Sequence, residues 1–200
     1  CLTCRKWQCC STPRRARNAS AAGKFCPTLA RTSILAPASG ATTRWGRVGN
    51  IPHPTRRAVL TPFGPVTLVE DRGLVLRLDW RADPGEGSLL LDEAARQLSA
   101  YFDGRLTRFD LPLDWGEGLN ARVRRAMAAI PFGEMRTYGQ IARAVGAPAQ
   151  AVGQACGANP LPILIPCHRV TGTDWFGGFS APGGVETKAA LLRHEGALLI

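Results

Sequence analysis

The chain has 200 residues, of which 45% are hydrophobic, so it is long enough for one or two small domains with an ordinary packed core. It has no apolar run of the roughly 20 residues that a membrane helix needs, so we expect a soluble protein with no membrane partner. The formal net charge is +10, but residues 1–57 contain 11 Lys or Arg and no Asp or Glu, so this charge does not by itself indicate nucleic-acid binding.

The first 57 residues form a basic tail rich in Ser, Ala, Thr, Arg and Pro, without a sustained period of 2 or 3.6. We expect this tail to be disordered. An organellar targeting peptide, an accessory DNA-binding arm and a fragmentary start of the chain all remain open. Cys1 and Cys4 have the spacing of a zinc half-site that Cys26 and His53 would complete, but no second pair follows, so we favour unstructured thiols and assign no metal.

Residues 58–115 predict a small α+β domain with an antiparallel sheet. Short apolar runs at 58–60, 65–69 and 74–80, the last two separated by a turn, are typical of a strand followed by a hairpin. An amphipathic helix that ends near Gly104 comes next, because apolar residues recur at helical spacing. These residues are Leu91, Ala94, Ala95, Leu98, Tyr101 and Phe102.

Residues 116–200 predict a helical domain. After a helix over 119–130, two short helices, from Tyr138 to Val145 and from Ala149 to about Ala158, flank a Gly-Ala-Pro break, which is the outline of a helix-turn-helix. The last of these helices consists almost entirely of small residues. Small side chains allow a close approach to a narrow surface such as the DNA minor groove, and tight packing against neighbouring helices would explain them equally well.

Cys167 and His168 place a thiol beside an imidazole at the end of an apolar run that begins just after Asn159-Pro160 and that we interpret as strand-like. A thiol with a pKa near ~8.5 is only a few per cent thiolate at neutral pH, so a nucleophilic cysteine needs a neighbouring base. His168 is the candidate base. Residues 119–170 carry 6 basic side chains and 1 acidic one, which predicts a basic surface around this pair.

A longer set of motifs resembles the O6-alkylguanine-DNA alkyltransferase family, roughly from Ala58 to Gly196. In order, the motifs are Ile-Pro-Phe-Gly-Glu at 130–134, Thr-Tyr-Gly at 137–139, Ala-Val-Gly at 151–153, Asn-Pro at 159–160 and Pro-Cys-His-Arg-Val at 166–170. The resemblance implies an RNase H-like amino-terminal domain followed by the helix-turn-helix domain.

The activity that the resemblance implies is direct-reversal DNA repair by a single-turnover methylated-DNA–protein-cysteine methyltransferase. A methyl or alkyl group would pass irreversibly from O6 of guanine to Cys167, with O4 of thymine left open as a further donor. In such proteins the histidine acts through a bound water, so His168 would be the base and Glu195 would orient it. The resemblance also implies that Asn159 braces the active-site turn and that Tyr138 rotates the nucleotide and protonates the departing base. No cofactor is expected.

The expected partner is double-stranded DNA containing O6-alkylguanine, approached from the minor groove, with the damaged base flipped out of the stack. The residues that the resemblance implies at the DNA are Tyr138, Gln150, Ala151, Gly153, Gln154, Gly157 and Arg169. Those that it implies around the flipped base, within or before the loop 175–184, are Val170, Phe179, Ser180 and Gly183. We expect a monomer in the cytoplasm that associates with the nucleoid when it binds DNA.

Some positions depart from the family pattern. Gln150 stands where many members have an arginine that fills the space left by the flipped base, and Arg124 lies near a usual tryptophan. Lys188 keeps the family lysine, which we interpret as a structural contact. Cys156 is interpreted as an ordinary small residue, with a second alkylation site as the alternative.

Two other classes of protein are weighed against this interpretation. Alkyltransferase-like proteins bind alkylated guanine without repairing it, but they commonly carry Trp in place of the acceptor cysteine, and this chain has Cys167. Cysteine hydrolases use the same residue types for acyl transfer. Their histidine usually comes from a distant segment, whereas His168 is the next residue along the chain.

Overall fold

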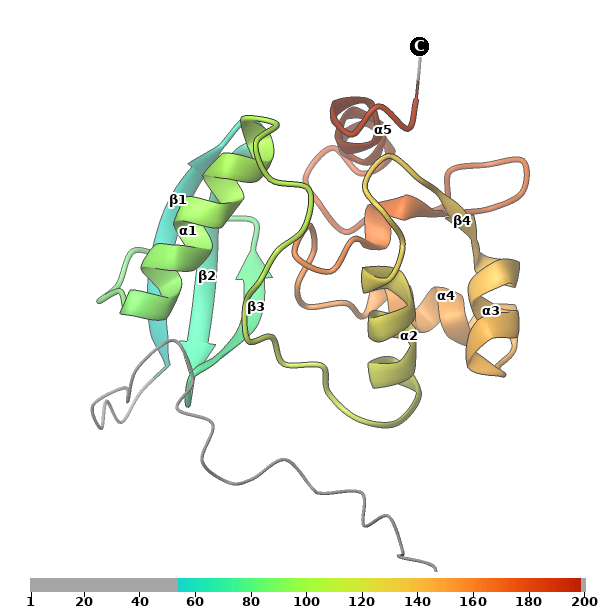
Figure 1. Ribbon diagram of the computed structural model, residues 1–200, viewed down its shortest axis with the longest axis horizontal. Helices are drawn as coiled ribbons and strands as arrows, with labels where there is room; N and C mark the ends of the chain where they lie inside the picture. The colour runs from blue at the N-terminus through green and yellow to red at the C-terminus, as the bar shows by residue number, and fades with distance from the viewer. Residues whose placement is uncertain (1–53, 199–200) are drawn as a thin grey trace, which may run out of the picture. The chain divides into compact units, whose positions relative to one another are not determined.

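The structure is a computed structural model that describes residues 54–198. The predictions for the basic tail, namely disorder, a targeting or DNA-binding role and the zinc site, therefore lie outside the described residues. The described elements follow one another in the order β1 (Thr55–Thr61), β2 (Gly64–Asp71), β3 (Leu74–Asp79), α1 (Leu89–Phe102), α2 (Gly118–Ala128), β4 (Arg136–Thr137), α3 (Tyr138–Val145), α4 (Ala149–Gly157), the 3-10 helix η1 (Cys167–Arg169), β5 (Val170–Thr171) and α5 (Val185–His194) (Figure 1).

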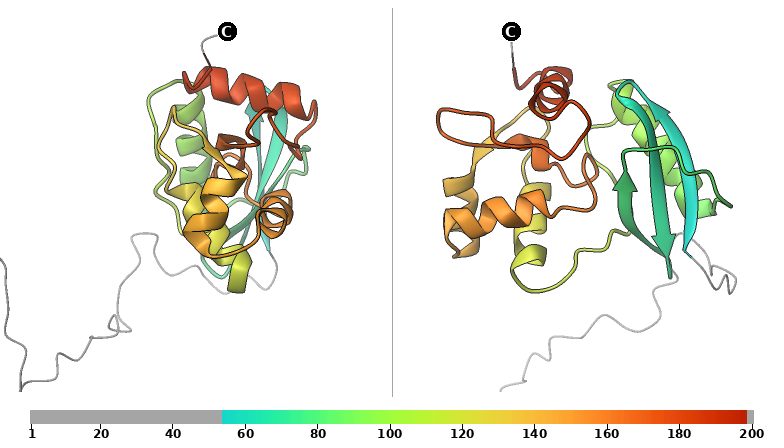
Figure 2. Two further views of the ribbon diagram at one scale, coloured as in Figure 1. Left: turned by 90° about the vertical axis from the view of Figure 1, so that its right-hand side faces the viewer. Right: turned by 180° about the vertical axis from the view of Figure 1, so that it is seen from behind.

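The first three strands form an antiparallel sheet in the order β1-β2-β3, as the sequence predicted. β1 starts at Thr55, three residues before the Ala58 at which the apolar pattern begins. The central strand is the most deeply buried, because Val66 and Leu68 are fully covered. Figure 2 shows α1 covering one face of this sheet, so this half of the protein has the α+β class that the sequence predicted.

α1 is the amphipathic helix that the sequence predicted, and its caps explain where it begins and ends. The Ser88 side chain accepts a hydrogen bond from the Leu91 backbone N–H, which satisfies one of the free amides of the first turn. Gly104 has φ +70°, a left-handed conformation that ends the helix readily in a residue without a side chain. The buried face of α1 extends to Tyr101, one residue before the helix ends at Phe102.

The three helices predicted after the linker are also present as α2, α3 and α4. α3 begins with a capping box, in which Thr137 accepts from the Gln140 backbone and Gln140 accepts from the Thr137 backbone. It ends at Gly146, whose φ of +65° suits the turn into α4. The parallel pair β4 and β5 lies beside the start of α3 and brings the chain from η1 next to Thr137.

The apolar run that follows Asn159-Pro160 is a turn, so our interpretation of it as strand-like was wrong. We call residues 160–166 the active-site turn. Its hydrogen bonds are local, from the Ile165 N–H to the Leu161 carbonyl at 2.8 Å, and Ile163 has a left-handed φ of +69°. The side chains are apolar because the turn is buried inside the protein. A connection is also made to the edge of the sheet, where the Leu78 N–H donates to the Pro160 carbonyl at 2.8 Å.

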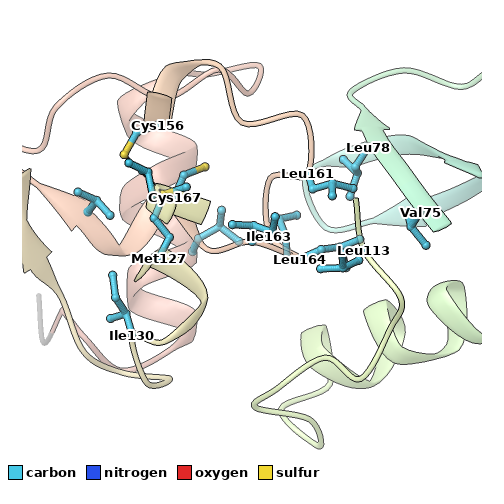
Figure 3. Packing of buried hydrophobic residues seen from close by; sticks show 14 of the residues in the cluster. Val75, Leu78, Leu113, Met127, Ile130, Cys156, Leu161, Ile163, Leu164 and Cys167 are labelled. Atoms are coloured by element: carbon cyan, nitrogen blue, oxygen red, sulfur yellow. Dashed lines mark hydrogen bonds between the residues drawn. The ribbon is translucent and has the colours of Figure 1, made fainter. Parts of the chain in front are cut away.

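A single apolar cluster connects the sheet to the candidate nucleophile. Figure 3 shows Leu161, Ile163 and Leu164 of the active-site turn lying between Leu78 on the sheet side and Met127 on the helical side. Leu161 is fully buried and Ile163 and Leu164 nearly so. The active-site turn therefore rests on both halves of the protein. The boundary predicted at residue 115/116 remains a prediction.

None of the helices in the described part of the chain has the length and apolar character to cross a membrane.

Candidate active site

Cys167 is the first residue of η1 and lies at a pocket of about 790 Å³. The thiol-bearing side chain is only 7% exposed, so a group must enter the pocket to reach it. The pocket walls come from α3, α4 and the loop that follows β5. They consist of Thr137, Tyr138, Gly139, Ala149, Gln150, Gly153, Cys156, Gly157, Gly172, Thr173, Trp175, Gly178, Phe179 and Ser180.

Behind Cys167 lies a buried group of polar side chains around one carboxylate, which we call the Glu195 cluster: Tyr101, His168, Arg169 and Glu195. The His168 Nε2 atom lies 2.7 Å from Glu195 Oε1, and neither side chain is exposed. Arg169 donates from Nε to Oε2 at 2.8 Å and from Nη2 to Oε1 at 2.9 Å. This two-pronged pairing fixes the plane of the carboxylate.

The cluster is arranged to keep Glu195 ionised and His168 neutral. Burial alone would raise the pKa of Glu195, but hydrogen bonds from His168 and Arg169 outweigh it and lower the pKa to about 2. Burial lowers the pKa of His168 below its usual 6.5, partly offset by the bond to Glu195. Because an ionised carboxylate only accepts hydrogen bonds, Nε2 of the neutral ring carries the proton and Nδ1 is an acceptor.

The Nδ1 atom of His168 is buried and has no hydrogen-bond partner among the described residues. A buried acceptor without a partner is uncommon in folded proteins and often marks a functional group. Since Nε2 is bonded to Glu195, Nδ1 is the ring atom that is available to take a proton. The orientation of His168 is therefore that of a general base whose far side is held by a carboxylate.

The thiol itself is held in its neutral form at rest. Burial raises the pKa of Cys167, and a hydrogen bond with Asn159 and the charge of Lys188 offset only part of this rise. The Asn159 amide also donates to the Ile165 carbonyl at 3.0 Å and accepts from the Leu161 N–H at 3.2 Å, across the active-site turn. Asn159 thus joins the two ends of this turn by hydrogen bonds.

Lys188 is fully buried and joins β5 to the loop that follows it. Its Nζ donates to the Val170 carbonyl at 2.6 Å and to the Phe176 carbonyl at 2.5 Å. Burial lowers the pKa of this lysine to about 8. Both bonds are to main-chain carbonyls, which agrees with the interpretation of Lys188 as a structural contact.

Tyr138 is the first residue of α3 and forms one wall of the pocket. Its ring lies 6.2 Å from that of Trp175, which is 64% exposed at the pocket mouth. The chain passes close to the hydroxyl at Gly177, where an added Cβ would lie 2.5 Å from the Tyr138 oxygen. A residue without a side chain is therefore needed at 177 while Tyr138 keeps this position.

The remaining predicted site residues fall into two groups. Gln150, Gly153 and Gly157 of α4 line the pocket, as do Phe179 and Ser180. Ala151 and Gln154 lie on α4 outside this lining. Val170 is fully buried behind the pocket, and Gly183 lies before α5, where an added Cβ would collide with Thr187.

Arg169 is not placed to contact DNA, so that prediction was wrong. The side chain is 5% exposed, and its three nitrogens are bonded inside the protein, two to Glu195 and Nη1 to the Ile130 carbonyl at 2.6 Å. The charge is needed beside the buried carboxylate. Sequence reasoning also missed Tyr101, whose hydroxyl belongs to the Glu195 cluster; its only signal was a phenol on an otherwise apolar helix face.

Arg124, a departure from the family pattern, and Cys156 can also be located. Arg124 on α2 is 8% exposed, and its buried Nε atom has no hydrogen-bond partner among the described residues. Cys156 lines the pocket with its sulfur 3.5 Å from that of Met127, and burial raises its pKa to about 12. Between residues 54 and 198, no group of three or more His, Cys, Asp or Glu side chains could hold a metal ion.

Comparisons with known proteins identify the family of the chain. Residues 118–197 match the family model described as 6-O-methylguanine DNA methyltransferase, DNA binding domain. A methylated-DNA–protein-cysteine methyltransferase of Mycobacterium tuberculosis is 43% identical over 156 residues, which cover 70% of this chain and 90% of the relative. The chain belongs to the methylated-DNA–protein-cysteine methyltransferase family.

Similarity to this family extends to an archaeal member and to solved structures. A methylated-DNA–protein-cysteine methyltransferase of Metallosphaera sedula is 38% identical over 146 residues, covering 70% of this chain and 92% of the relative. The crystal structure of Mycobacterium tuberculosis OGT in complex with DNA has a TM-score of 0.63 and 40% identity, covering 70% of this chain and 92% of that one. The family and the α+β fold expected from the sequence are confirmed.

Proposed function

We propose that Cys167 is the residue that accepts the alkyl group in direct-reversal DNA repair by this methyltransferase. The observation that carries the proposal is the position of the Cys167 thiol in the pocket, directly before the imidazole of the Glu195 cluster. The sulfur attacks the alkyl carbon on O6 of guanine, and the S–C bond forms as the C–O6 bond breaks. The product is a stable thioether, so each molecule acts once and the reaction needs no cofactor.

His168 takes the thiol proton at Nδ1, through a water molecule, as the sulfur attacks. The charge that then appears on the imidazole is stabilised by the ionised Glu195 on its other side. This arrangement suits a thiol that is neutral at rest, because the proton leaves only as the reaction proceeds. Tyr138 lines the same pocket and supplies a proton to the departing guanine, which leaves as the neutral base.

The α3–α4 pair acts as a DNA-binding helix-turn-helix, with α4 in the minor groove. The exposed or half-exposed positions Gln150, Gly153, Gln154 and Gly157 share one face of α4. If these glycines served internal packing, an added Cβ would meet neighbouring atoms, yet none lies within 4 Å at Gly153 or Gly157. Open space at both positions favours close approach by a partner over tight packing.

The damaged base enters the pocket once it has left the stack. Phe179 and Ser180 face it from the loop after β5, and Gln150 at the start of α4 occupies the place vacated in the duplex, where its amide can bond to the unpaired partner base. The protein acts as a monomer, since one chain supplies the whole arrangement. The cytoplasm is the proposed location, because the substrate is DNA.

Intact-protein mass spectrometry tests the proposal. Equimolar protein and a duplex with one O6-methylguanine should give a mass increase of about one methyl group, which Cys167→Ala abolishes. Cys156→Ala is the matched control, since it removes a second buried thiol at the same pocket and should leave the increase in place. Unmodified wild-type protein that binds the lesion selectively would instead identify a non-enzymatic lesion-binding protein, an alternative that the family does not favour.

A further inference from the structure

Tyr101 of α1 brings a hydroxyl from the sheet side of the protein into the Glu195 cluster. Its oxygen donates to Glu195 Oε1 at 2.7 Å, the same carboxylate oxygen that His168 Nε2 contacts. The side chain is fully buried, and 94 residues separate it from Glu195 along the chain. A phenol at this depth is stable only if its hydroxyl has a partner.

The position of this hydroxyl is fixed from several directions. The Tyr101 ring lies 5.4 Å from Phe109, 6.0 Å from Phe132 and 5.1 Å from His194. The Tyr101 carbonyl lies 2.9 Å from His194 Nε2, so main chain and side chain both meet the end of α5. Packing of this kind holds the hydroxyl beside Glu195.

Tyr101 competes with His168 for the charge of one carboxylate. Burial, followed by the charge of Glu195, raises the pKa of Tyr101 far above 10, so the phenol remains a proton donor throughout the working pH range. Each donor to Glu195 stabilises the carboxylate and lowers the share of its charge that reaches the imidazole. The other charged or titratable groups acting on His168 are Arg169 and Lys188, with Cys167 adjacent in the chain.

We propose that Tyr101 is a positioning residue for alkyl transfer: its hydroxyl orients the Glu195 carboxylate and limits the negative charge that it offers to His168. This inference rests on the proposed function of Cys167 and His168. It assigns to the sheet half of the protein a part in the chemistry, although the thiol, its base and the pocket lining belong to the other half. The proton itself does not pass through Tyr101.

The test compares single-turnover methyl transfer at saturating DNA across about pH 5 to 9 for the wild type and Tyr101→Phe. Without the hydroxyl, the carboxylate charge stabilises protonated His168 better, so the pKa of His168 rises. The acid limb of the rate profile should move upward by about one pH unit, and the rate at neutral pH should fall by at most about threefold, with DNA affinity unchanged. Leu98→Val is the matched control for packing, because Leu98 is buried on the same helix and should leave the limb in place.

A second variant strengthens the hydrogen bond that residue 101 donates to Glu195 instead of removing it. Tyr101 and Tyr138 are the two tyrosines of the chain, so 3-fluorotyrosine incorporated into a Tyr138→Phe background enters at Tyr101 alone. The stronger donor should move the acid limb downward relative to unlabelled Tyr138→Phe. An inert wild type would overturn the proposed function itself. The role of Tyr101 alone would be overturned if the wild type is active but its rate profile superimposes on that of Tyr101→Phe. It would also be overturned if the acid limb is the same with tyrosine and with 3-fluorotyrosine at position 101.

Discussion

At the scale of single residues, the candidate nucleophile is notable for being unactivated at rest. Burial raises the pKa of the Cys167 thiol, and the partial offset from Asn159 and Lys188 leaves the thiol neutral. A permanent thiolate would react with other electrophiles and oxidants. A thiol that loses its proton only when His168 accepts it, inside a pocket closed by α4 and Tyr138, reacts selectively with what the pocket admits.

Arg124 should cost the protein stability. Its Nε is buried without a hydrogen-bond partner among the described residues, at a place near which the family has an apolar tryptophan. Arg124→Met keeps an unbranched side chain as far as the position of Nε and replaces the guanidinium by apolar atoms, so it should raise the free energy of unfolding by about 1–2 kcal/mol. Urea unfolding measures this change. Arg125→Met, on the exposed side of the same helix, is the control, and equal or lower stability for Arg124→Met would contradict the prediction.

At the scale of elements, α4 has a glycine in its interior, on the face that the proposed function places at the DNA. Gly153 lies in the helix interior, where glycine is destabilising by about 1 kcal/mol relative to alanine. Open space around its Cα shows that packing does not require this glycine. The stability lost at this position is consistent with a helix whose outer face must admit another molecule.

Gly153→Leu should therefore separate folding from DNA binding. The change removes a helix-destabilising residue, so we expect thermal stability to be equal or higher by about 0.5–1 kcal/mol. The side chain projects from the pocket face of α4, so affinity for an O6-methylguanine duplex should fall about tenfold or more. Fluorescence anisotropy and thermal melting give the two quantities. Ala144→Leu is the control, because Ala144 is exposed on α3 outside the pocket lining; it should change DNA affinity and thermal stability less than Gly153→Leu does. Unaltered DNA binding by Gly153→Leu would argue against a position of α4 at the DNA.

The active-site turn shows where a local pattern is insufficient. An apolar run bounded by prolines is compatible with a buried strand or with a buried turn, because both cover their side chains. Here Ile163 takes a left-handed conformation, and the hydrogen bonds of the run are made within the turn and through Asn159. The surroundings supply this conformation, since the turn is clamped between the sheet edge and Met127 (Figure 3).

At the scale of the whole molecule, Glu195 is the point at which distant segments meet. Its carboxylate is bonded by Tyr101 of α1 and by His168 and Arg169 of η1, while Glu195 itself follows α5. The cluster therefore forms only when both halves of the protein are folded. Its stability should be visible in the pH dependence of unfolding.

Acid should destabilise the protein through Glu195 in a defined window. The pKa of Glu195 is about 2 in the folded protein against 4.5 for an ordinary glutamate. The carboxylate therefore stabilises the fold fully above pH 4.5, and this stabilisation is lost as the pH falls from 4.5 towards 2. The contribution is about 3 kcal/mol. His168, whose pKa is lowered by burial, acts in the same direction as pH falls below 6.5.

Urea unfolding at a series of pH values tests this account. Glu195→Gln should flatten the fall in stability between pH 4.5 and 2, while Glu117→Gln, which removes an exposed carboxylate at the start of α2, should keep the wild-type slope. Equal slopes for wild type and Glu195→Gln would show that the carboxylate does not carry the acid sensitivity.

The sequence by itself predicted the local elements and the candidate reacting pair. Helical spacing and the break at Gly146 predicted α1 to α4 because these signals act within a few residues of chain. Motif order identified Cys167, His168 and the family. Tertiary structure alone decided that Arg169 turns inward and that Tyr101 completes the Glu195 cluster. Both outcomes depend on which groups surround a buried charge, and segments far apart in the chain supply those groups only after folding.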